Sequence, residues 1–435
     1  MFIAMLLFQT AAGAPDTLAL SLAQARARAR ADNPALRAEW ADARAAAQGP
    51  REASRALLPT VSAGLDAVRT TDPVAVFGMK LRQADLAAGD LALDALNRPA
   101  AYQDFTARLT VEQPLLNLEG LYGHAAAGRA ADARAAAARR AAGATDLAVI
   151  RAYWDAQLAA ERVAALDTGS AAARAQAQRA EALHGQGQVS GLDARLARLR
   201  AAGLEARRLG AMAEAENASA ALRALLALPD STPLALTDAL SNAPLDDTLP
   251  AAAGAAARAD VQALRLGERA AALGIRRAWA QNLPSIAAYG TLAGHSRPAP
   301  FGAGSDDWTV GVALVWRPFA GLAGVGAVAR ARAGRDAAAA RREAAERAAG
   351  IEIGRAARLH GAALRAVAVA TEALREATEA LAQAELRYRT GAAPITEVLD
   401  VQAALTNARL DLLAARHDVL VLRGAYDFAN GAFDQ

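Results

Sequence analysis

The chain has 435 residues, of which 54% are hydrophobic but only 4% aromatic, and it contains no cysteine. Its 48 basic and 45 acidic residues are interspersed and leave a net charge of +3, which does not favour nucleic acid as a partner. The lack of cysteine excludes disulfides, cysteine-based metal sites, thiol catalysis and an N-terminal lipid-anchored cysteine.

The first residues are similar to a secretory signal peptide, which we expect at residues 1–14. An apolar run at residues 2–8 is followed by the small residues Ala12, Gly13 and Ala14, as in the hydrophobic region and cleavage site of such peptides. Seven apolar residues are too few to cross a bilayer as a helix, and no apolar stretch of about 20 residues follows. If the protein crosses a membrane, it must do so with strands.

The two halves of the chain repeat each other. The stretch LPTV at residues 58–61 matches LPSI at residues 283–286, 225 residues later, and Gly187 matches Gly391, 204 residues later. The sequence therefore predicts a tandem duplication. We expect the two structural repeats at residues 15–248 and 249–435.

Each repeat contains two segments that alternate between apolar and small or polar residues. In the last of them, Trp308, Val310 and Val312 alternate with Thr309 and Gly311. Such alternation predicts strands with two different environments, and about ten residues suffice for a tilted strand to cross the hydrocarbon layer. A half-buried soluble sheet is the alternative for any single strand. The strands are expected at about residues 59–69, 105–114, 284–294 and 307–317.

Aromatic residues near the ends of these segments predict an interfacial girdle. Trp308 and Trp316 bracket one apolar strand face, as aromatic side chains do at both edges of a membrane. The predicted girdle consists of Phe105, Trp308, Trp316 and Phe319.

Long helices follow the strands in both repeats. No proline occurs between about residues 117 and 184, and a helix of some 70 residues extends for roughly 100 Å. A glycine-marked turn then precedes a further helix, whose apolar residues step by three and four in a heptad pattern. We expect long helices at about residues 117–185 and 322–389, and turns at 186–192 and 390–396.

Four strands cannot form a closed sheet in a membrane. Every edge N–H and C=O group in lipid must be paired, and closed membrane barrels begin at eight strands. At least two copies of the chain must therefore share one barrel.

Several motifs together resemble the TolC-type outer-membrane efflux channels. They are the duplicated LPT and LPS strand starts, FGMKL at residues 77–81, VEQPLLN at residues 111–117 and YRTGAAPITEVLD at residues 388–400. The resemblance extends over about residues 18–432. It implies a mainly α fold with a membrane β-barrel portion: a homotrimer whose twelve-stranded barrel, four strands per chain, lies in the Gram-negative outer membrane and continues as a twelve-helix tunnel through the periplasm.

The resemblance also implies a function. The chain would be the outer-membrane channel of a tripartite efflux or type I secretion system, which exports substrates passively and docks with a periplasmic adaptor and an inner-membrane pump. It would be neither an enzyme nor a cofactor-binding protein, and no catalytic or metal-ligand motif is found. The exported substrate and the class of pump cannot be read from the sequence.

The two glycine-marked turns would be the helical tips at the periplasmic entrance. The resemblance implies that acids line this entrance and that a tyrosine gates it, and rings of carboxylates favour cations. Where relatives carry a latch arginine and a threonine, this chain has Ala393 and Leu192, so the latch would be weaker or apolar, with Leu192 as a plug. The predicted gate residues are Leu192, Asp193, Tyr388, Glu397 and Asp400.

The first tip is expected to be the better contact for an adaptor. Arg179, Leu183 and Ser190 have the spacing of adaptor contacts in the family, and Gly187 and Gly391 complete the predicted set. A simpler interpretation stays open for single residues, because a glycine ends a helix and Glu397 in a first turn complements the helix dipole.

A different function class remains as the alternative. Long helices also occur in soluble or surface-attached scaffolds and in periplasmic adaptor subunits built on a coiled-coil hairpin. An adaptor would carry β-rich domains that flank a single hairpin, whereas here strands interrupt the helices twice at matched positions. Dependence on detergent during purification distinguishes the two classes.

Overall fold

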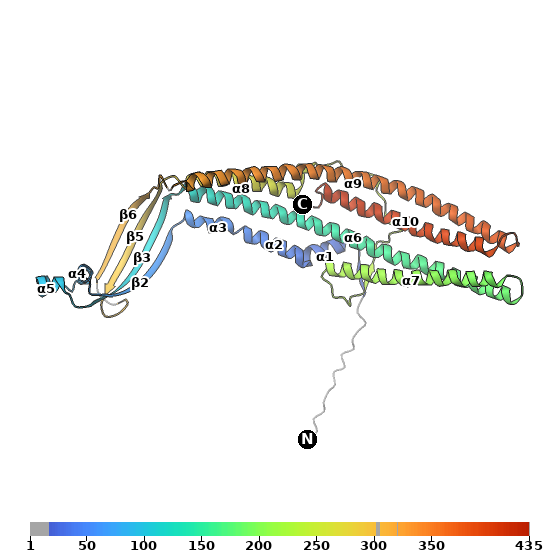
Figure 1. Ribbon diagram of the computed structural model, residues 1–435, viewed down its shortest axis with the longest axis horizontal. Coiled ribbons are helices and arrows are strands. Elements are labelled where there is room, and N and C mark those ends of the chain that lie inside the picture. Colours follow the sequence, from blue (N-terminus) through green and yellow to red (C-terminus); the bar gives the residue numbers. More distant parts are fainter. Residues whose placement is uncertain (1–16, 302–304, 320, 435) are drawn as a thin grey trace, which may run out of the picture. The chain divides into compact units, whose positions relative to one another are not determined.

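The computed structural model describes residues 17–301, 305–319 and 321–434. The predicted signal peptide at residues 1–14 lies outside the described residues. The described chain is mainly helical and contains two small sheets (Figure 1). It divides into two compact units, one formed by Met1–Asp42, Ala135–Gln262 and Glu343–Gln435, the other by Ala43–Arg134 and Ala263–Arg342.

The second unit contains a four-stranded antiparallel sheet with the order β2-β3-β5-β6. Its strands are β2 (Thr60–Thr70), β3 (Tyr102–Leu116), β5 (Ser285–Ser296) and β6 (Ser305–Val315). In the described part of the chain, β2 and β6 each pair on one side only. The sheet therefore has two open edges.

The register gives this sheet one apolar and one polar face. Residues that lie opposite each other across strands point to the same face. One row runs Ala63, Leu109, Leu292 and Trp308, and the adjacent row runs Ser62, Thr110, Thr291 and Thr309. Further members of the apolar face are largely exposed, among them Val61, Leu65, Val310, Val312 and Leu314. None of the residues that the structure describes covers this face.

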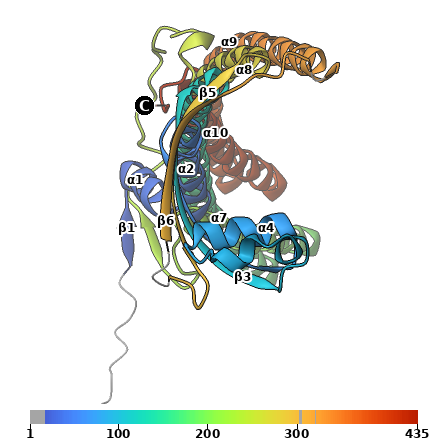
Figure 2. The ribbon, with the colours of Figure 1, turned by 90° about the vertical axis from the view of Figure 1, so that its left-hand side faces the viewer.

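The strand that we expected at about residues 105–114 begins three residues earlier. Tyr102 pairs with Thr70 at the far end of β2, so the ladder continues beyond the apolar stretch. Beside it, α4 (Pro73–Arg82) lies next to β3 (Figure 2). Gln83, the residue after α4, donates a hydrogen bond to Asp104 Oδ1 at 2.6 Å. Polar contacts that sequence alternation does not reveal thus extend the strand.

Shorter elements connect the strands and helices of this unit. α5 (Leu93–Asn97) and the 3₁₀ turn η2 (Ala88–Leu91) follow α4 in the segment between β2 and β3. α3 (Gly49–Ala53) and η1 (Ser54–Ala56) precede β2.

Four helices have residues in both units: α2 (Pro34–Ala46), α6 (Leu118–Gly185), α8 (Ala259–Ala280) and α9 (Ala323–Arg389). The 68 residues of α6 and the 67 of α9 form uninterrupted helices, each about 100 Å long at 1.5 Å per residue. Among the described residues, no helix has the length and apolar character needed to span a membrane.

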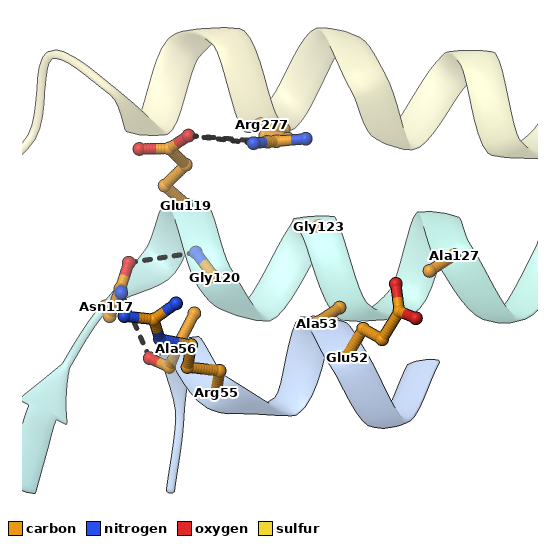
Figure 3. Close-up of a pocket in the computed structure, with 10 residues that line it drawn as sticks. All are labelled: Glu52, Ala53, Arg55, Ala56, Asn117, Glu119, Gly120, Gly123, Ala127 and Arg277. Atoms are coloured by element: carbon orange, nitrogen blue, oxygen red, sulfur yellow. Dashed lines mark hydrogen bonds and ion pairs between the residues drawn. The ribbon is translucent and has the colours of Figure 1, made fainter. Parts of the chain in front are cut away.

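The start of α6 is fixed by close packing against η1 (Figure 3). The side chain of Asn117 accepts a hydrogen bond from the Gly120 N–H at 2.8 Å and donates one to the Ala56 carbonyl at 3.0 Å. A Cβ atom on Gly120 would lie 2.6 Å from the Cβ of Ala56. Beside this contact is an open cavity of about 560 Å³, where Glu119 forms an ion pair with Arg277 at 3.2 Å.

The first unit contains α1 (Leu22–Asp32), α7 (Gly191–Leu225) and α10 (Ile395–Ala429), while α2 (Pro34–Ala46) begins in it. A short parallel pair joins β1 (Leu18–Leu20) to β4 (Leu234–Leu236). The fully buried Tyr153 of α6 donates a hydrogen bond to the Leu20 carbonyl at 3.0 Å. The main apolar cluster of this unit therefore surrounds the β1–β4 pair.

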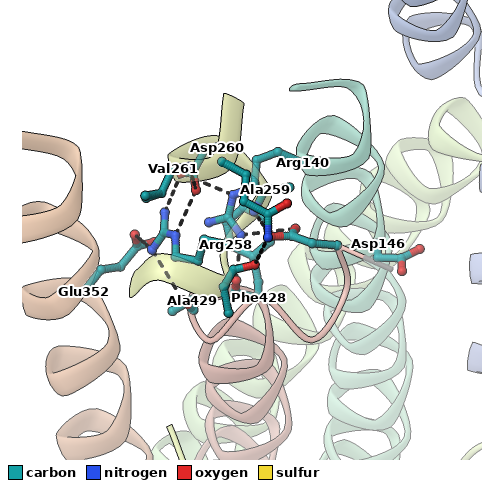
Figure 4. Close-up of polar contacts among 12 residues, drawn as sticks. Arg140, Asp146, Arg258, Ala259, Asp260, Val261, Glu352, Phe428 and Ala429 are labelled. Carbon is teal, nitrogen blue, oxygen red and sulfur yellow. Dashed lines mark hydrogen bonds and ion pairs between the residues drawn. The ribbon is translucent and has the colours of Figure 1, made fainter. Parts of the chain in front are cut away.

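Buried charges in the first unit are paired. Arg258, which follows η3 (Ala255–Ala257), contacts Asp260 at 2.7 Å and Glu352 at 2.6 Å (Figure 4). Arg140 lies 3.5 Å from the centre of the Phe428 ring and donates a hydrogen bond to the Phe428 carbonyl at 2.7 Å. These contacts join α8, α9, α6 and α10, since a buried charge is tolerated only with partners.

Candidate functional site

The two glycine-marked turns have the same backbone geometry. Gly187 and Gly391 adopt φ angles of +71° and +73°, which favour glycine. After α6, the N–H of Gln188 bonds to the Leu183 carbonyl at 2.9 Å, and after α9 the N–H of Ala392 bonds to the Arg387 carbonyl at 2.8 Å. Both helices therefore end in a Schellman motif, which satisfies their last carbonyl groups.

The helices that follow the turns begin differently. At the start of α7, the Ser190 hydroxyl accepts the Asp193 N–H at 3.2 Å and Asp193 Oδ2 accepts the Ser190 N–H at 3.2 Å, which completes a capping box. At α10 the N-cap is Pro394, which makes no side-chain capping bond. Asp193 thus has a capping role in the single chain, whereas Glu397 is held by another contact.

Glu397 and Asp400 each form an ion pair with an arginine. Arg387 Nη1 lies 2.8 Å from Glu397 Oε1 within the α9–α10 hairpin. Arg200 Nη2 lies 2.8 Å from Asp400 Oδ1 and joins α7 to α10. Two of the three predicted entrance carboxylates are therefore balanced by a cation of the same chain.

A cavity of about 860 Å³ lies between the two tips. Tyr388 contributes to its wall and packs against an apolar cluster made mostly of alanines from α6 and α7. Burial raises the pKa of Tyr388, and the nearby Asp193 carboxylate raises it further. Tyr388 is therefore a neutral hydroxyl at neutral pH.

The structure brings most of the site residues predicted at the two tips to this cavity. Its lining includes the predicted gate residues Asp193 and Tyr388 as well as the predicted adaptor contacts Arg179, Leu183, Ser190 and Gly391. The two predicted sets are therefore not spatially separate. Gly187, Glu397 and Asp400 do not line it, and neither does Leu192, which is 65% exposed on α7.

The predicted girdle residues do not share one environment. Trp308, Trp316 and Phe319 are exposed, by 75%, 57% and 81%. Phe105 is half-buried on β3 and lies opposite Ala67 and Ser296. Three of the four aromatic side chains are thus exposed and could contact lipid or solvent around the sheet.

Sequence reasoning did not find Arg200. Its partner Asp400 lies 200 residues away, and no local spacing links the two positions. One heptad further along both helices, Arg207 contacts the side-chain oxygen of Asn407 at 3.3 Å. This matched spacing of seven in α7 and α10 is the one pattern from which the pairing could have been inferred.

No metal centre is found among the described residues, because no group of three or more potential ligands comes together. The chemistry of the tips is therefore that of hydrogen bonds, ion pairs and small apolar side chains. The side chains at the two tips can therefore contact a partner protein, or attract or repel a passing ion by their charge.

Comparisons with known proteins agree with this arrangement. Residues 254–423 match the family described as "Outer membrane efflux protein". A comparison with curated proteins gives no match.

Solved structures of similar fold cover nearly the whole chain. The outer membrane protein VceC of Vibrio cholerae is 19% identical with a TM-score of 0.79, over 94% of this chain and 96% of that one. The CmeC outer membrane channel of Campylobacter jejuni is 16% identical with a TM-score of 0.82, over 94% and 85%. The MtrE outer membrane channel of Neisseria gonorrhoeae is 19% identical with a TM-score of 0.79, over 94% and 88%.

Members of the matched family are transport channels, not enzymes, and they form homotrimers that work with adaptor and pump partners. They lie in the Gram-negative outer membrane and extend into the periplasm. The described fold, mainly helical with a few strands, is the fold of these channels. Residues 254–423 thus match the outer membrane efflux protein family, and the described fold is that of the outer-membrane channels named above.

Proposed function

We propose that three copies of this chain form the passive outer conduit of a tripartite efflux or type I secretion system. The observation that carries this proposal is the four-stranded sheet with one exposed apolar face, one polar face and two open edges. In lipid the open edges must be paired. Three copies would supply twelve strands, which close into a barrel whose polar face lines the pore.

The height of the apolar face supports a membrane location. Trp308 lies in β6 and Trp316 directly follows its last residue, eight residues further on. This is about 26 Å along an extended strand at 3.3 Å per residue, or about 20 Å of membrane height at a tilt of about 40°. The apolar band of outer-membrane barrels is about 25 Å tall and is bordered by aromatic residues. We therefore assign Trp308 and Trp316 to opposite membrane interfaces, with Phe105 and Phe319 as further members of the girdle.

The two helical tips would form the entrance at the periplasmic end. Asp193, Tyr388, Glu397 and Asp400 would act there as gate residues, with the exposed Leu192 as an apolar plug. The cavity lined by Arg179, Leu183 and Ser190 would receive a helical tip of the adaptor, and Gly187 and Gly391 would allow both turns. Transport would need no energy from the channel itself, because the pump supplies it.

The duplicated sequence fits this arrangement. Each repeat, at residues 15–248 and 249–435, would supply two strands and one helical hairpin, preceded in the precursor by a signal peptide at residues 1–14. A trimer would then have six similar repeats around the pore. Each chain would thus contribute two of the six glycine-marked turns at the entrance.

Two arginine substitutions on neighbouring residues of β6 test the proposal. Val310 lies on the apolar face and is 74% exposed, whereas Thr309 lies on the polar face opposite Thr291. On a lipid-facing strand, arginine costs about 2–4 kcal/mol near the membrane centre, while pore-facing positions tolerate charge. Val310→Arg should therefore reduce the amount of trimer in the outer membrane, and Thr309→Arg should not.

The function itself is measured in planar bilayers. The wild-type protein and Thr309→Arg should give stable, ohmic currents without an energy source. Equal effects of both substitutions on outer-membrane assembly, or a wild-type protein that is soluble and gives no current, would refute the proposal and favour the helical scaffold.

A further inference from the structure

The predicted entrance acids are not an unbalanced acidic ring in this chain. Glu397 contacts Arg387 and Asp400 contacts Arg200, each at 2.8 Å. Asp193 is instead held by the hydroxyl of Ser190 at 2.7 Å. Of the three carboxylates, two therefore carry a cationic partner within the same chain.

The Arg200–Asp400 pair is open to solvent. The two side chains are 55% and 66% exposed, and an exposed ion pair contributes little to folding stability. The effect of this ion pair on the local electric field is separate from its small contribution to folding stability. A guanidinium at contact distance reduces the carboxylate's field to that of a short dipole, which salt screens within about 10 Å.

The next pair along the same two helices provides a contrast. Arg207 contacts the neutral side chain of Asn407 at 3.3 Å. The two arginines thus lie on the same side of α7, one opposite a carboxylate and one opposite an amide. Removal of either arginine takes away one positive charge, but only removal of Arg200 exposes an unpaired acid.

We propose that Arg200 and Arg387 determine the charge selectivity of the entrance by neutralising Asp400 and Glu397. The inference depends on the proposed channel function, since a threefold assembly would repeat each ion pair around the pore. The rings of Asp400 and Glu397 then discriminate weakly between cations and anions, and they lack the strong divalent-cation site that bare carboxylate rings would provide. Uncharged or anionic cargo would meet little electrostatic barrier at these two positions, and in the part of the chain that the structure describes Asp193 is the one predicted entrance acid without a cationic partner.

A charge cycle on Arg200 and Asp400 tests the inference in planar bilayers under a salt gradient. Arg200→Gln should shift the reversal potential toward cation selectivity, and Asp400→Asn should shift it toward anion selectivity. The double variant should return to the wild-type value, because both charges of the pair are then absent. Arg387→Gln should shift the potential in the same direction as Arg200→Gln.

Block by added Mg²⁺ provides the second measurement. An unpaired carboxylate ring binds divalent cations, so Arg200→Gln should lower the half-blocking concentration by roughly tenfold. Arg207→Gln is the matched control and should leave this concentration close to the wild-type value. Heat-modifiable migration of each variant verifies that the trimer has assembled.

The outcomes separate the two proposals. A wild-type protein that conducts no current overturns the channel function and this inference with it. A wild-type channel with strong cation selectivity, or one whose selectivity and Mg²⁺ block do not change in Arg200→Gln, overturns only the role of the arginines.

Discussion

Asp146 on α6 has a fully buried carboxylate that accepts hydrogen bonds from two arginines of α1. Arg26 Nη2 lies 2.7 Å from it and Arg30 Nη2 lies 2.6 Å from it. The two arginine side chains are 32% and 42% exposed, so they stay partly hydrated when the carboxylate is removed, and the loss of hydrogen bonds between charged groups costs about 1.5–3 kcal/mol. Asp146→Ala should therefore lower the melting temperature by several degrees.

Asp32→Ala is the control for this prediction. Asp32 also contacts an arginine of α1, Arg28, but both side chains are exposed, and such pairs contribute about 0–1 kcal/mol. Thermal unfolding followed by circular dichroism compares the two variants. Equal melting temperatures would show that the buried carboxylate does not hold α1 against α6.

The contacts of His417 lead us to expect that the free energy of unfolding depends on pH. Burial alone would lower the pKa of its ring, but hydrogen bonds and charges of Asp155, 2.7 Å away on α6, and of Asp418 raise it above its ordinary value of 6.5. A raised pKa means that the folded state binds the proton more tightly. The resulting stability is complete below about pH 6.5 and is lost as the pH rises through the folded-state pKa.

Melting temperatures of the wild-type protein and of His417→Gln measure this contribution. The wild-type advantage should be largest near pH 6 and should decrease as the pH rises above the folded-state pKa of His417. An advantage that grows with pH would mean that the neutral ring is the stabilising form.

At the residue scale, the sequence predicts roles that depend on neighbours along the chain and misses those that depend on tertiary contacts. The spacing of three from Ser190 to Asp193 is visible in the sequence and corresponds to a capping box. The link from Arg200 to Asp400 is not visible, since it depends on which faces of α7 and α10 meet. The charge of the entrance could therefore not be derived from its acids alone.

At the element scale, the junction between η1 and α6 depends on a glycine. A Cβ atom on Gly120 would lie 2.6 Å from Ala56 Cβ and 3.1 Å from its carbonyl oxygen. Because neither atom is the end of a flexible side chain, Gly120→Ala should displace the junction and cost about 1–3 kcal/mol. The same substitution at Gly128 meets nothing within 4 Å and should stabilise the helix by about 0.5–1 kcal/mol.

Chemical unfolding of the two glycine variants tests this contrast. Gly120→Ala should unfold at lower denaturant concentration than the wild-type protein, and Gly128→Ala at an equal or higher one. A similar small effect at both positions would mean that the junction accommodates a methyl group.

The faces of helices and strands can be predicted from the sequence where apolar residues recur at a regular spacing. The alternation of Trp308, Val310 and Val312 predicts a single apolar face, and the register of β6 presents these residues together. The alternation does not reveal that β3 begins at Tyr102, because its first residues are ordered by polar contacts with the segment after α4. Period-2 patterns therefore identify the face of a strand better than its ends.

At the scale of the whole molecule, the single chain does not form a closed sheet. Its sheet has two open edges in the described residues, and its apolar face remains exposed, which is unusual for a monomer in water. The repeated sequence and the edge argument predict that copies must combine. The number three comes from the family resemblance and not from the physics of one chain.

We propose that copies of this chain close one another's sheets within a membrane. The mass of the detergent-solubilised protein before and after heating tests this closure most directly. We predict a species of three chain masses that is extracted only with detergent and dissociates to single chains on boiling. A monomer that remains soluble without detergent would contradict the claim.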